Sequence, residues 1–331
     1  MQPQLFSAQS ESLRKRVPFE LRPTNLPGAF TTPPPAQEFD PNRASFATLI
    51  KHGVMWRRPQ HGDSPYLVRA WNRAFSRNWF GGDRISPVLE SRTGQNHALR
   101  GLGSNGSGYT SRNWSGGIIQ GQWATVVGYW SVPPAELSTE ADHRRYECDS
   151  ACWVGLDGFS SEDALQAGIQ RRVDTTGRAQ HVAWCEWYVP PRHDSPAYIW
   201  QTDVVNFSLA PGNRVYCSVQ YIAQKAAGLV YFANDSTGHH FSLTLAPPPG
   251  AAAAGDSIEW IAEAPAKGEN AGGIPLPPAR FTTALGCSAD GQTVALPHNG
   301  ERIHARREEE SLSSVELSDD GVTVFFKPLP G

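Results

Sequence analysis

Short runs of β-branched and aromatic residues, each bounded by Gly, Pro or Asn, recur from residue 113 to the C-terminus. Runs of this length and composition predict β-strands. No helical periodicity separates them, so the pattern predicts an all-β antiparallel sandwich of two packed sheets. The predicted strands are Gly117–Ile119, Trp123–Val132, Ala151–Val154, His181–Val189, Arg214–Ile222, Leu229–Ala233, His240–Leu245, Ser257–Ile261, Arg280–Leu285 and Val322–Phe326.

The N-terminal third of the chain has a different pattern, which predicts two helices. The first begins with Asp40 and Pro41 and ends near Gly53. The second begins at Ser64–Pro65 and ends at Gly81–Gly82. Each start combines an N-capping side chain with a proline in the first turn, and each end has a glycine.

The second predicted helix is amphipathic, with an apolar stripe and a basic stripe at helical spacing. The apolar stripe is Leu67, Trp71, Ala74 and Phe75, and the basic stripe is Arg69, Arg73 and Arg77. Two interpretations follow. The helix binds a partner that has an apolar groove with acidic neighbours, or it packs on its own domain and leaves a solvated basic face.

Two further segments suggest how the chain is divided. Residues 1–38 are Pro-rich and are expected to be extended or disordered. Gly101–Gly108 has the composition of a flexible linker. We therefore expect a basic, partly helical N-terminal part at residues 1–108 and a β-sandwich domain at residues 109–331.

Alternate residues of a strand point to opposite faces of a sheet, and this rule places several carboxylates together. Glu186 shares a face with Trp184, whereas Glu259 and Glu263 share a face opposite Trp260. On the concave surface of a bent sheet these carboxylates would line a cleft. On a convex surface they would be ordinary solvated residues, and alternation by itself favours this second interpretation.

Composition and charge refine this picture. Charged residues are 18% of the chain, which contains 31 Gly, 27 Pro and 11 Trp, as suits a loop-rich β-sandwich. Residues 1–112 contain 15 Lys and Arg against 7 Asp and Glu, a formal charge of +8, whereas the remainder has 14 against 25, or −11. The two parts are expected to attract each other, unless the basic part binds an external polyanion.

Several classes of site and of protein lack support in the sequence. A run of about 18 apolar residues is absent, and Arg14–Arg16 is not followed by the apolar core of a signal peptide. The five cysteines include Cys148 and Cys152, which could close a small loop, but spacing does not settle their pairing. No paired Cys or His spacing indicates zinc, and no recognisable elbow pairs a Ser with a His. We expect no metal, no cofactor, no nucleic acid and no membrane partner.

Five motifs occur in a fixed order, each with chemistry-bearing residues. They are Asn113–Gly117, Trp153–Gly158, Leu165–Gly168, Trp184–Tyr188 and Asp256–Glu263. Together they closely resemble the motifs of the glutamic peptidases, the eqolisin family, from residue 113 to the C-terminus. The resemblance implies a sandwich of the concanavalin-like or jelly-roll type, in which a bent sheet forms a concave cleft, and the activity of an acid-acting endopeptidase.

In the eqolisins a Gln and a Glu form the catalytic pair, and the matching positions here are Gln166 and Glu263. A carboxylate can take a proton from water and later give it to the leaving amine. A carboxamide N–H can stabilise the developing oxyanion. The resemblance therefore implies that Glu263 activates the water and that Gln166 positions it and holds the oxyanion. The residues expected to line the substrate cleft are Trp153, Asp157, Trp184, Glu186 and Glu259.

For several of these residues an ordinary structural role is the alternative. Trp153 could be a core residue alone, and Asp157, which precedes Gly158, is by itself a turn residue. Cys152 and Cys185 flank aromatic strands and are expected to be buried or bridged rather than nucleophilic.

Eqolisins are made as secreted precursors with a basic propeptide over an acidic catalytic domain, so the resemblance implies that residues 1–108 are an inhibitory prosegment of a monomeric, secreted zymogen. An acidic run follows the catalytic Glu in fungal members, but here the chain continues Ala264–Pro265–Ala266. Fewer carboxylates near the pair predict a milder acid optimum than the family is known for.

Two other functions remain open from the residues. An aromatic-lined sheet suits a catalytically silent module that binds carbohydrate or peptide. A glycoside hydrolase could use Glu186 and Glu263 as acid and nucleophile, and it would not need Gln166.

Overall fold

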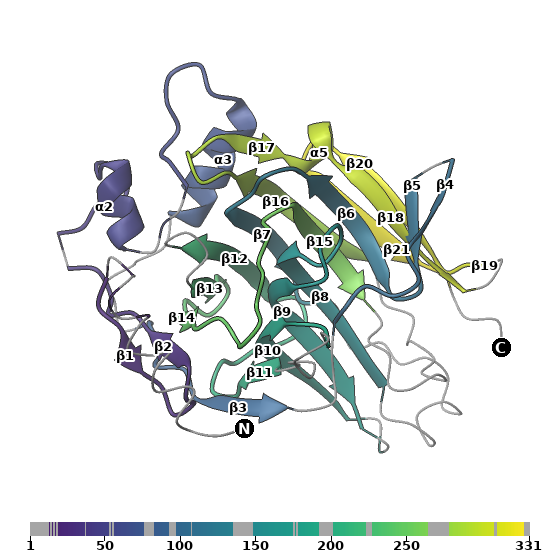
Figure 1. Ribbon diagram of the computed structural model, residues 1–331, viewed down its shortest axis with the longest axis horizontal. Coiled ribbons are helices and arrows are strands. Elements are labelled where there is room, and N and C mark those ends of the chain that lie inside the picture. The colour runs from purple at the N-terminus through teal and green to yellow at the C-terminus, as the bar shows by residue number, and fades with distance from the viewer. Residues whose placement is uncertain are drawn as a thin grey trace.

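The computed structural model describes residues 13, 15, 17, 19–36, 38–52, 54, 56–75, 83–92, 97–106, 108–134, 148–174, 176, 178–191, 201–222, 227–263, 278–307 and 310–327. Two β-sheets pack against each other as a sandwich, with short helices outside them (Figure 1). The predicted fold class is confirmed.

The first sheet, called sheet 1, is antiparallel and begins with two short strands from the N-terminal third. Its order is β1 (Arg22–Pro23), β2 (Ala29–Thr31), β14 (His240–Leu245), β13 (Ala227–Asn234), β12 (Arg214–Ile222), β7 (Thr125–Ser131), β16 (Ala279–Cys287), β21 (Gly321–Phe326) and β20 (Ser313–Ser318), with β17 (Thr293–Ala295) beside β16.

The second sheet, called sheet 2, has all five motif segments. Its order is β3 (Leu89–Arg92), β11 (Gln201–Val204), β10 (Ala179–Tyr188), β9 (Ala164–Val173), β8 (Cys148–Asp157), β15 (Ser257–Glu263), β6 (Trp114–Gln120), β18 (Glu301–Arg307), β5 (Gly108–Ser111) and β4 (Gly103–Asn105), with β19 (Glu310–Ser311) beside β18. β5 runs parallel to β18, whereas the neighbours from β3 to β18 are antiparallel.

The core lies between the sheets and takes alternate residues of each inner strand. From sheet 2 it takes Cys152, Val154, Leu156, Leu165, Ala167, Ile169, Ala183, Cys185, Trp187, Ile258, Trp260 and Ala262. The indole of Trp260 also donates a hydrogen bond to the carbonyl oxygen of Val127 in sheet 1 at 2.8 Å. The predicted alternation in β10 and β15 is therefore confirmed.

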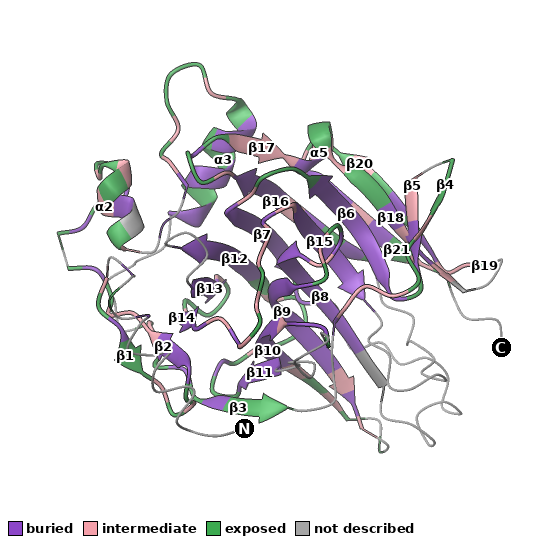
Figure 2. Cartoon of the chain, in the orientation of Figure 1, coloured by how far each residue is buried: buried purple, intermediate pink, exposed green. Residues whose placement is uncertain are grey.

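The opposite, outer face of sheet 2 is not solvated, as Figure 2 shows by the buried colour of its central strands. Glu186, Glu259 and Glu263 lie on this face and are at most 1% exposed. The interpretation of these glutamates as solvated residues is wrong. Buried carboxylates are costly without partners, so their surroundings have to be explained.

The predicted strands Arg214–Ile222 and His240–Leu245 match β12 and β14. Trp123–Val132 extends past both ends of β7, and the other predicted strands overlap longer ones. The pattern missed β17 to β20 and, in sheet 2, β9 and β11. β9 contains Gln, Gly and Arg residues on its outer face, and β11 is polar, so neither has the β-branched and aromatic composition that predicts a strand.

The helices begin and end differently from the prediction. α2 (Phe46–Lys51) begins after Ser45, whose Oγ accepts from the backbone N–H of Thr48, so the predicted start at Asp40 is wrong. α3 (Pro65–Ala74) begins as predicted, with Ser64 Oγ accepting from the Leu67 N–H. It ends at Ala74, short of the predicted Gly81–Gly82, which lie outside the described residues. A four-residue helix, α5 (Leu296–Asn299), follows β17.

The apolar stripe of α3 packs on the outer face of sheet 1. Tyr66, Leu67, Ala70, Trp71, Ala74 and Phe75 cluster with Val127, Tyr129, Tyr216, Tyr231, Ala233, Leu285 and Cys287. From the basic stripe, the Arg73 guanidinium lies over the Tyr129 ring and donates to Thr282 and Thr283. The helix therefore packs on strands of the predicted sandwich domain within the same chain, whereas the two interpretations were a partner or its own domain.

The segment predicted as a flexible linker is ordered where it is described. β4 and β5 pair as a hairpin, and β5 continues the pairing onto β18 at the edge of sheet 2. Gly108 has a φ of 140°, and a Cβ there would lie 2.6 Å from the carbonyl oxygen of Arg302. This glycine thus serves close backbone pairing rather than flexibility.

Candidate active site

Most of the predicted site residues lie on the outer face of sheet 2, on the neighbouring strands β10, β9, β8 and β15. In the strand register Gln166 lies opposite Gly155 on one side and Glu186 on the other, and Gly155 lies opposite Glu259. Residues directly opposite each other share a face of the sheet. A Cβ on Gly155 would lie 3.3 Å from Glu259 Oε2 and 3.4 Å from Gln166 Cγ. The missing side chain of Gly155 therefore lets these two groups approach from either side.

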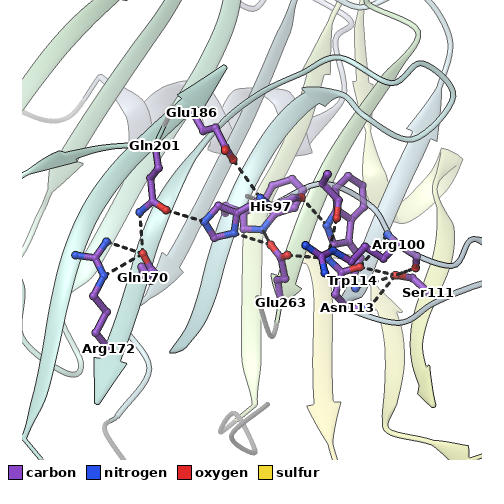
Figure 3. Close-up of polar contacts among 12 residues, drawn as sticks. His97, Arg100, Ser111, Asn113, Trp114, Gln170, Arg172, Glu186, Gln201 and Glu263 are labelled. Carbon is purple, nitrogen blue, oxygen red and sulfur yellow. Dashed lines mark hydrogen bonds and ion pairs between the residues drawn. The ribbon is translucent and has the colours of Figure 1, made fainter. Parts of the chain in front are cut away.

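Glu263 is fully buried at the end of β15, and three neighbouring side chains contact its carboxylate; Figure 3 shows His97 and Asn113 beside it. Trp153 Nε1 donates to Oε2 at 2.8 Å, and Asn113 Nδ2 donates to Oε1 at 2.8 Å. His97 Nδ1 also lies 2.8 Å from Oε2. Two donors from the sandwich and one ring from the N-terminal third thus hold the carboxylate in one orientation.

His97 is itself fully buried and contacts three strands of sheet 2 besides β15, namely β10, β11 and β6. Its ring stacks on Trp184 with 3.9 Å between centroids and 10° between planes. Its N–H donates to Glu186 Oε2 at 3.2 Å, and its carbonyl oxygen accepts from Trp114 Nε1 at 2.9 Å. Its Nε2 lies 3.3 Å from Gln201 Oε1. Figure 3 shows His97 between Gln201 and Glu263.

Gln166 differs from Glu263 in having no hydrogen-bond partner within the described part of the chain. Among the described residues, no group forms a hydrogen bond with either its Nε2 or its Oε1, although the side chain is fully buried. Glu186 Oε1 likewise lacks a partner within that part of the chain. Buried polar groups nearly always bind something, so a carboxamide of this kind on the same face as Glu263 is suited to act on a ligand.

Burial dominates the electrostatics of this face. It raises the pKa of Glu186 to about 7, against an opposing effect of His97. It also raises the pKa of Glu259 well above its ordinary value. Burial disfavours the charged ring of His97, but the carboxylates of Glu263 and Glu186 outweigh it, so the pKa of His97 is raised.

Asp157 has a different position from the other predicted cleft residues. It ends β8 with a φ of 66°, and its carboxylate accepts hydrogen bonds from the backbone N–H groups of Ala254, Gly255 and Asp256 and from the hydroxyl of Tyr221. It therefore fixes the loop before β15, at the opposite end of β8 from the residue that pairs with Glu263. This geometry agrees with the turn interpretation of Asp157.

The other predicted site residues lie together on the outer face of sheet 2. Three residues that were not predicted as site residues, Asn113, Gln201 and His97, contact them or each other there. Asn113 was part of a predicted motif, but nothing in the sequence indicated that it contacts Glu263. Gln201 lies in a short polar strand that the pattern missed. His97 is a lone histidine outside every motif, so no sequence signal connects it to the site.

Other catalytic groups are not supported within the described residues. No group of three His, Cys, Asp or Glu residues there could hold a metal ion. Cys152 and Cys185 are free thiols buried in the core, and burial raises the pKa of Cys152 to about 12. The expectation that they are buried is confirmed. In the described part of the chain, no helix is long and apolar enough to cross a membrane.

The outer face of sheet 2 thus combines a buried carboxylate with fixed donors and a buried carboxamide that has no partner among the described residues, an arrangement suited to hydrolysis. Comparison with known proteins gives its class. The family model described as Peptidase A4 family matches residues 112–326, and the chain belongs to that family. It is a glutamic endopeptidase of the eqolisin class whose substrates are polypeptides, as the motifs predicted.

Individual relatives are distant but cover the sandwich. Aspergillopepsin-2 from Aspergillus niger is 26% identical over 233 residues, which are 65% of this chain and 78% of that protein. The fold is similar to a crystal structure of scytalido-glutamic peptidase with a transition state analog inhibitor, at a TM-score of 0.51 and 20% identity, covering 65% of this chain and 98% of that one. It is also similar to SCP-B, an eqolisin in complex with the tripeptide Ala-Ile-His, at 0.50 and 20% over the same shares.

Proposed function

We propose that Glu263 and Gln166 are the catalytic pair. The Glu263 carboxylate takes a proton from the attacking water, and the protonated carboxyl then gives that proton to the leaving amine. The Gln166 amide N–H donates to the oxyanion that forms on the scissile carbonyl. The observation that best supports this pair is the contrast between a carboxylate held by Trp153 and Asn113 and a buried carboxamide with no partner among the described residues.

We also propose that the chain is a zymogen in which residues 1–108 inhibit the site. Support comes from His97, which lies within that part and covers Glu263 Oε2. A second contact also comes from residues 1–108. Arg92 Nε pairs with the buried carboxylate of Asp203 at 2.6 Å. Acid that protonates the carboxylates weakens both contacts. The formal charges of the two parts favour the same arrangement at neutral pH.

Three further features belong to this proposal. The enzyme is secreted, acts as a monomer and has a milder acid optimum than fungal eqolisins. Aspergillopepsin-2 as a relative supports the first of these, and Ala264–Pro265–Ala266 after the catalytic carboxylate support the last. A rate profile that peaks only at strongly acid pH would contradict the milder optimum.

Cleavage of a denatured protein after acid incubation tests the catalytic pair. Glu263→Gln is expected to abolish turnover, and Gln166→Ala is expected to lower kcat by about a hundredfold to a thousandfold, the usual effect of losing one oxyanion donor. Glu316→Gln, which changes an exposed carboxyl on β20, is the matched control and is expected to cleave normally. Activity that survives Glu263→Gln would assign the reaction to other residues.

A further inference from the structure

We infer that the outer face of sheet 2 has a binding site for the imidazolium side chain of a histidine within a peptide. His97 occupies this site in the intact chain, and a histidine-containing peptide occupies it after the N-terminal part has left. A peptide bound there inhibits the enzyme, because the imidazolium pairs with Glu263. The inhibition, but not the binding site, rests on the proposed role of Glu263.

The ring of His97 has contacts that suit an imidazolium and few other side chains. One face of the ring lies flat on Trp184, which favours a planar cation. Both ring nitrogens face oxygen atoms, Nδ1 at Glu263 Oε2 and Nε2 at Gln201 Oε1. A neutral imidazole has one N–H and one acceptor nitrogen, whereas an imidazolium has two N–H donors. Two acceptors therefore select the protonated ring.

This argument requires that the Gln201 carboxamide presents its oxygen, and its other contacts establish that. Gln201 Nε2 lies 2.7 Å from Gln170 Oε1 and 3.1 Å from Asp203 Oδ1, both oxygens. Gln170 Oε1 is in turn fixed by Arg172, whose Nε and Nη2 donate to it at 3.1 and 2.6 Å. Because Gln170 Oε1 accepts from both Arg172 and Gln201 Nε2, the oxygen of the Gln201 carboxamide points at the ring (Figure 3).

The backbone contacts show that the site recognises a residue in a chain rather than a free ring. Glu186 accepts the His97 N–H, and Trp114 Nε1 donates to the His97 carbonyl oxygen. Beyond His97, Asn113 Nδ2 donates to the Ala98 carbonyl at 2.9 Å and Asn113 Oδ1 accepts the Arg100 N–H at 3.0 Å. The binding surface therefore extends over the residues that follow the histidine.

The charges around the ring determine how binding depends on pH. Glu263 of β15 and Glu186 of β10 contact His97 directly. Two charged residues lie one contact further away, Asp203 of β11 beside Gln201 and Arg172 of β9 beside Gln170. Arg100 follows His97 in the same segment. The two carboxylates hold the pKa of His97 above its ordinary value in spite of burial. Burial raises the pKa of Glu186 to about 7, so acidification protonates Glu186 and removes one of the charges that favour the imidazolium.

The intact chain provides a test that needs no enzymatic activity. Nitrogen NMR of histidine-labelled protein, with the His97 signals assigned by loss in a His97→Gln variant, reports the protonation of each ring nitrogen. At neutral pH we expect both nitrogens of His97 to carry protons, with ring protons shifted upfield by Trp184. A neutral tautomer at that pH would overturn the proposed site, whatever the catalytic mechanism.

The acid-activated enzyme provides the second test. The probe is a blocked hexapeptide with the sequence of residues 97–102, and its matched control has Phe in place of the histidine. We expect the histidine peptide to compete with substrate about tenfold to a hundredfold more tightly than the Phe peptide, the usual effect of hydrogen bonds to a charged group. Gln201→Leu is expected to remove this difference while leaving inhibition by the Phe peptide unchanged.

The outcomes separate the two proposals. Equal inhibition by the two peptides, or a difference that persists in Gln201→Leu, would overturn the imidazolium site and leave the catalytic proposal intact. If the chain cleaves no protein after acid incubation, the catalytic proposal fails, and the NMR result alone then decides whether the site exists.

Discussion

The N-terminal third covers the outer faces of both sheets, but it does so with two different kinds of contact. On sheet 1 the helix α3 buries Leu67, Trp71 and Phe75 against aromatic and aliphatic side chains. On sheet 2 the His97 ring lies 2.8 Å from the Glu263 carboxylate, and His97 contacts other buried polar groups by hydrogen bonds. The first surface is apolar and the second is built from titratable groups.

This difference predicts which of the two contacts depends on pH. Burial of apolar area carries no charge and has no intrinsic dependence on pH. The contact of His97 depends on the charges of the ring and of Glu186, and the pKa of each is raised in the folded chain. We therefore expect acid to loosen the N-terminal third at sheet 2 while α3 stays bound to sheet 1.

The largest expected effect on stability is at the apolar contact. Trp71 is 2% exposed, packs on Trp56 and Phe75, and donates its indole N–H to Asn42. Trp71→Ala is expected to lower the free energy of unfolding by about 3–5 kcal/mol, because it leaves a cavity that the surroundings fill only in part. Chemical denaturation at acid and at neutral pH measures the loss.

The comparison requires the loss at Trp71 to be similar at both pH values. Val68 on the same helix is 39% exposed, and Val68→Ala is the control with little expected effect. A loss at Trp71 that appears at one pH only would show that the apolar contact is also coupled to titration.

A smaller effect is expected at the polar contact. Burial raises the pKa of Glu186 from 4.5 to about 7, so the folded state binds this proton more tightly than the unfolded state. Stability from this group is therefore present below pH 4.5 and is lost as pH rises to about 7. Glu186→Gln is expected to remove about 3 kcal/mol of this pH dependence, since each pKa unit corresponds to about 1.4 kcal/mol.

Denaturation midpoints across that pH range check the prediction. The raised pKa values of Glu259 and His97 have the same sign, so the variant keeps part of the slope. Glu316→Gln on the exposed side of β20 is expected to leave the slope unchanged. Equal slopes for Glu186→Gln and the unmodified chain would mean that Glu186 does not titrate in this range.

The smallest effect is expected at the start of α3. Ser64 Oγ accepts the Leu67 N–H at 3.3 Å, and Ser64→Ala removes this cap. The free energy of unfolding should fall by about 1 kcal/mol, whereas Ser64→Asp should keep most of it because Asp also caps helices. If the two substitutions destabilise equally, packing rather than capping fixes the start of the helix.

The pattern of residues anticipated much of the fold and part of the site. Alternation in β10 and β15 correctly separated Trp187 and Trp260 in the core from Glu186 and Glu263 on the other face, because this period is local to each strand. The motifs likewise gave the family. The end of α3 and the ordered hairpin β4–β5 were not anticipated, because both depend on what the segment packs against.

What the sequence determined by itself is the two faces of predicted strands such as β10 and β15 and the family to which the motifs belong. Tertiary structure alone decided that the polar face is buried, that Asp157 holds a loop, and that His97 lies against Glu263. The two residues are 166 positions apart in the chain. No local pattern connects groups at that separation, because their contact depends on the packing of several strands and on where the N-terminal third crosses them.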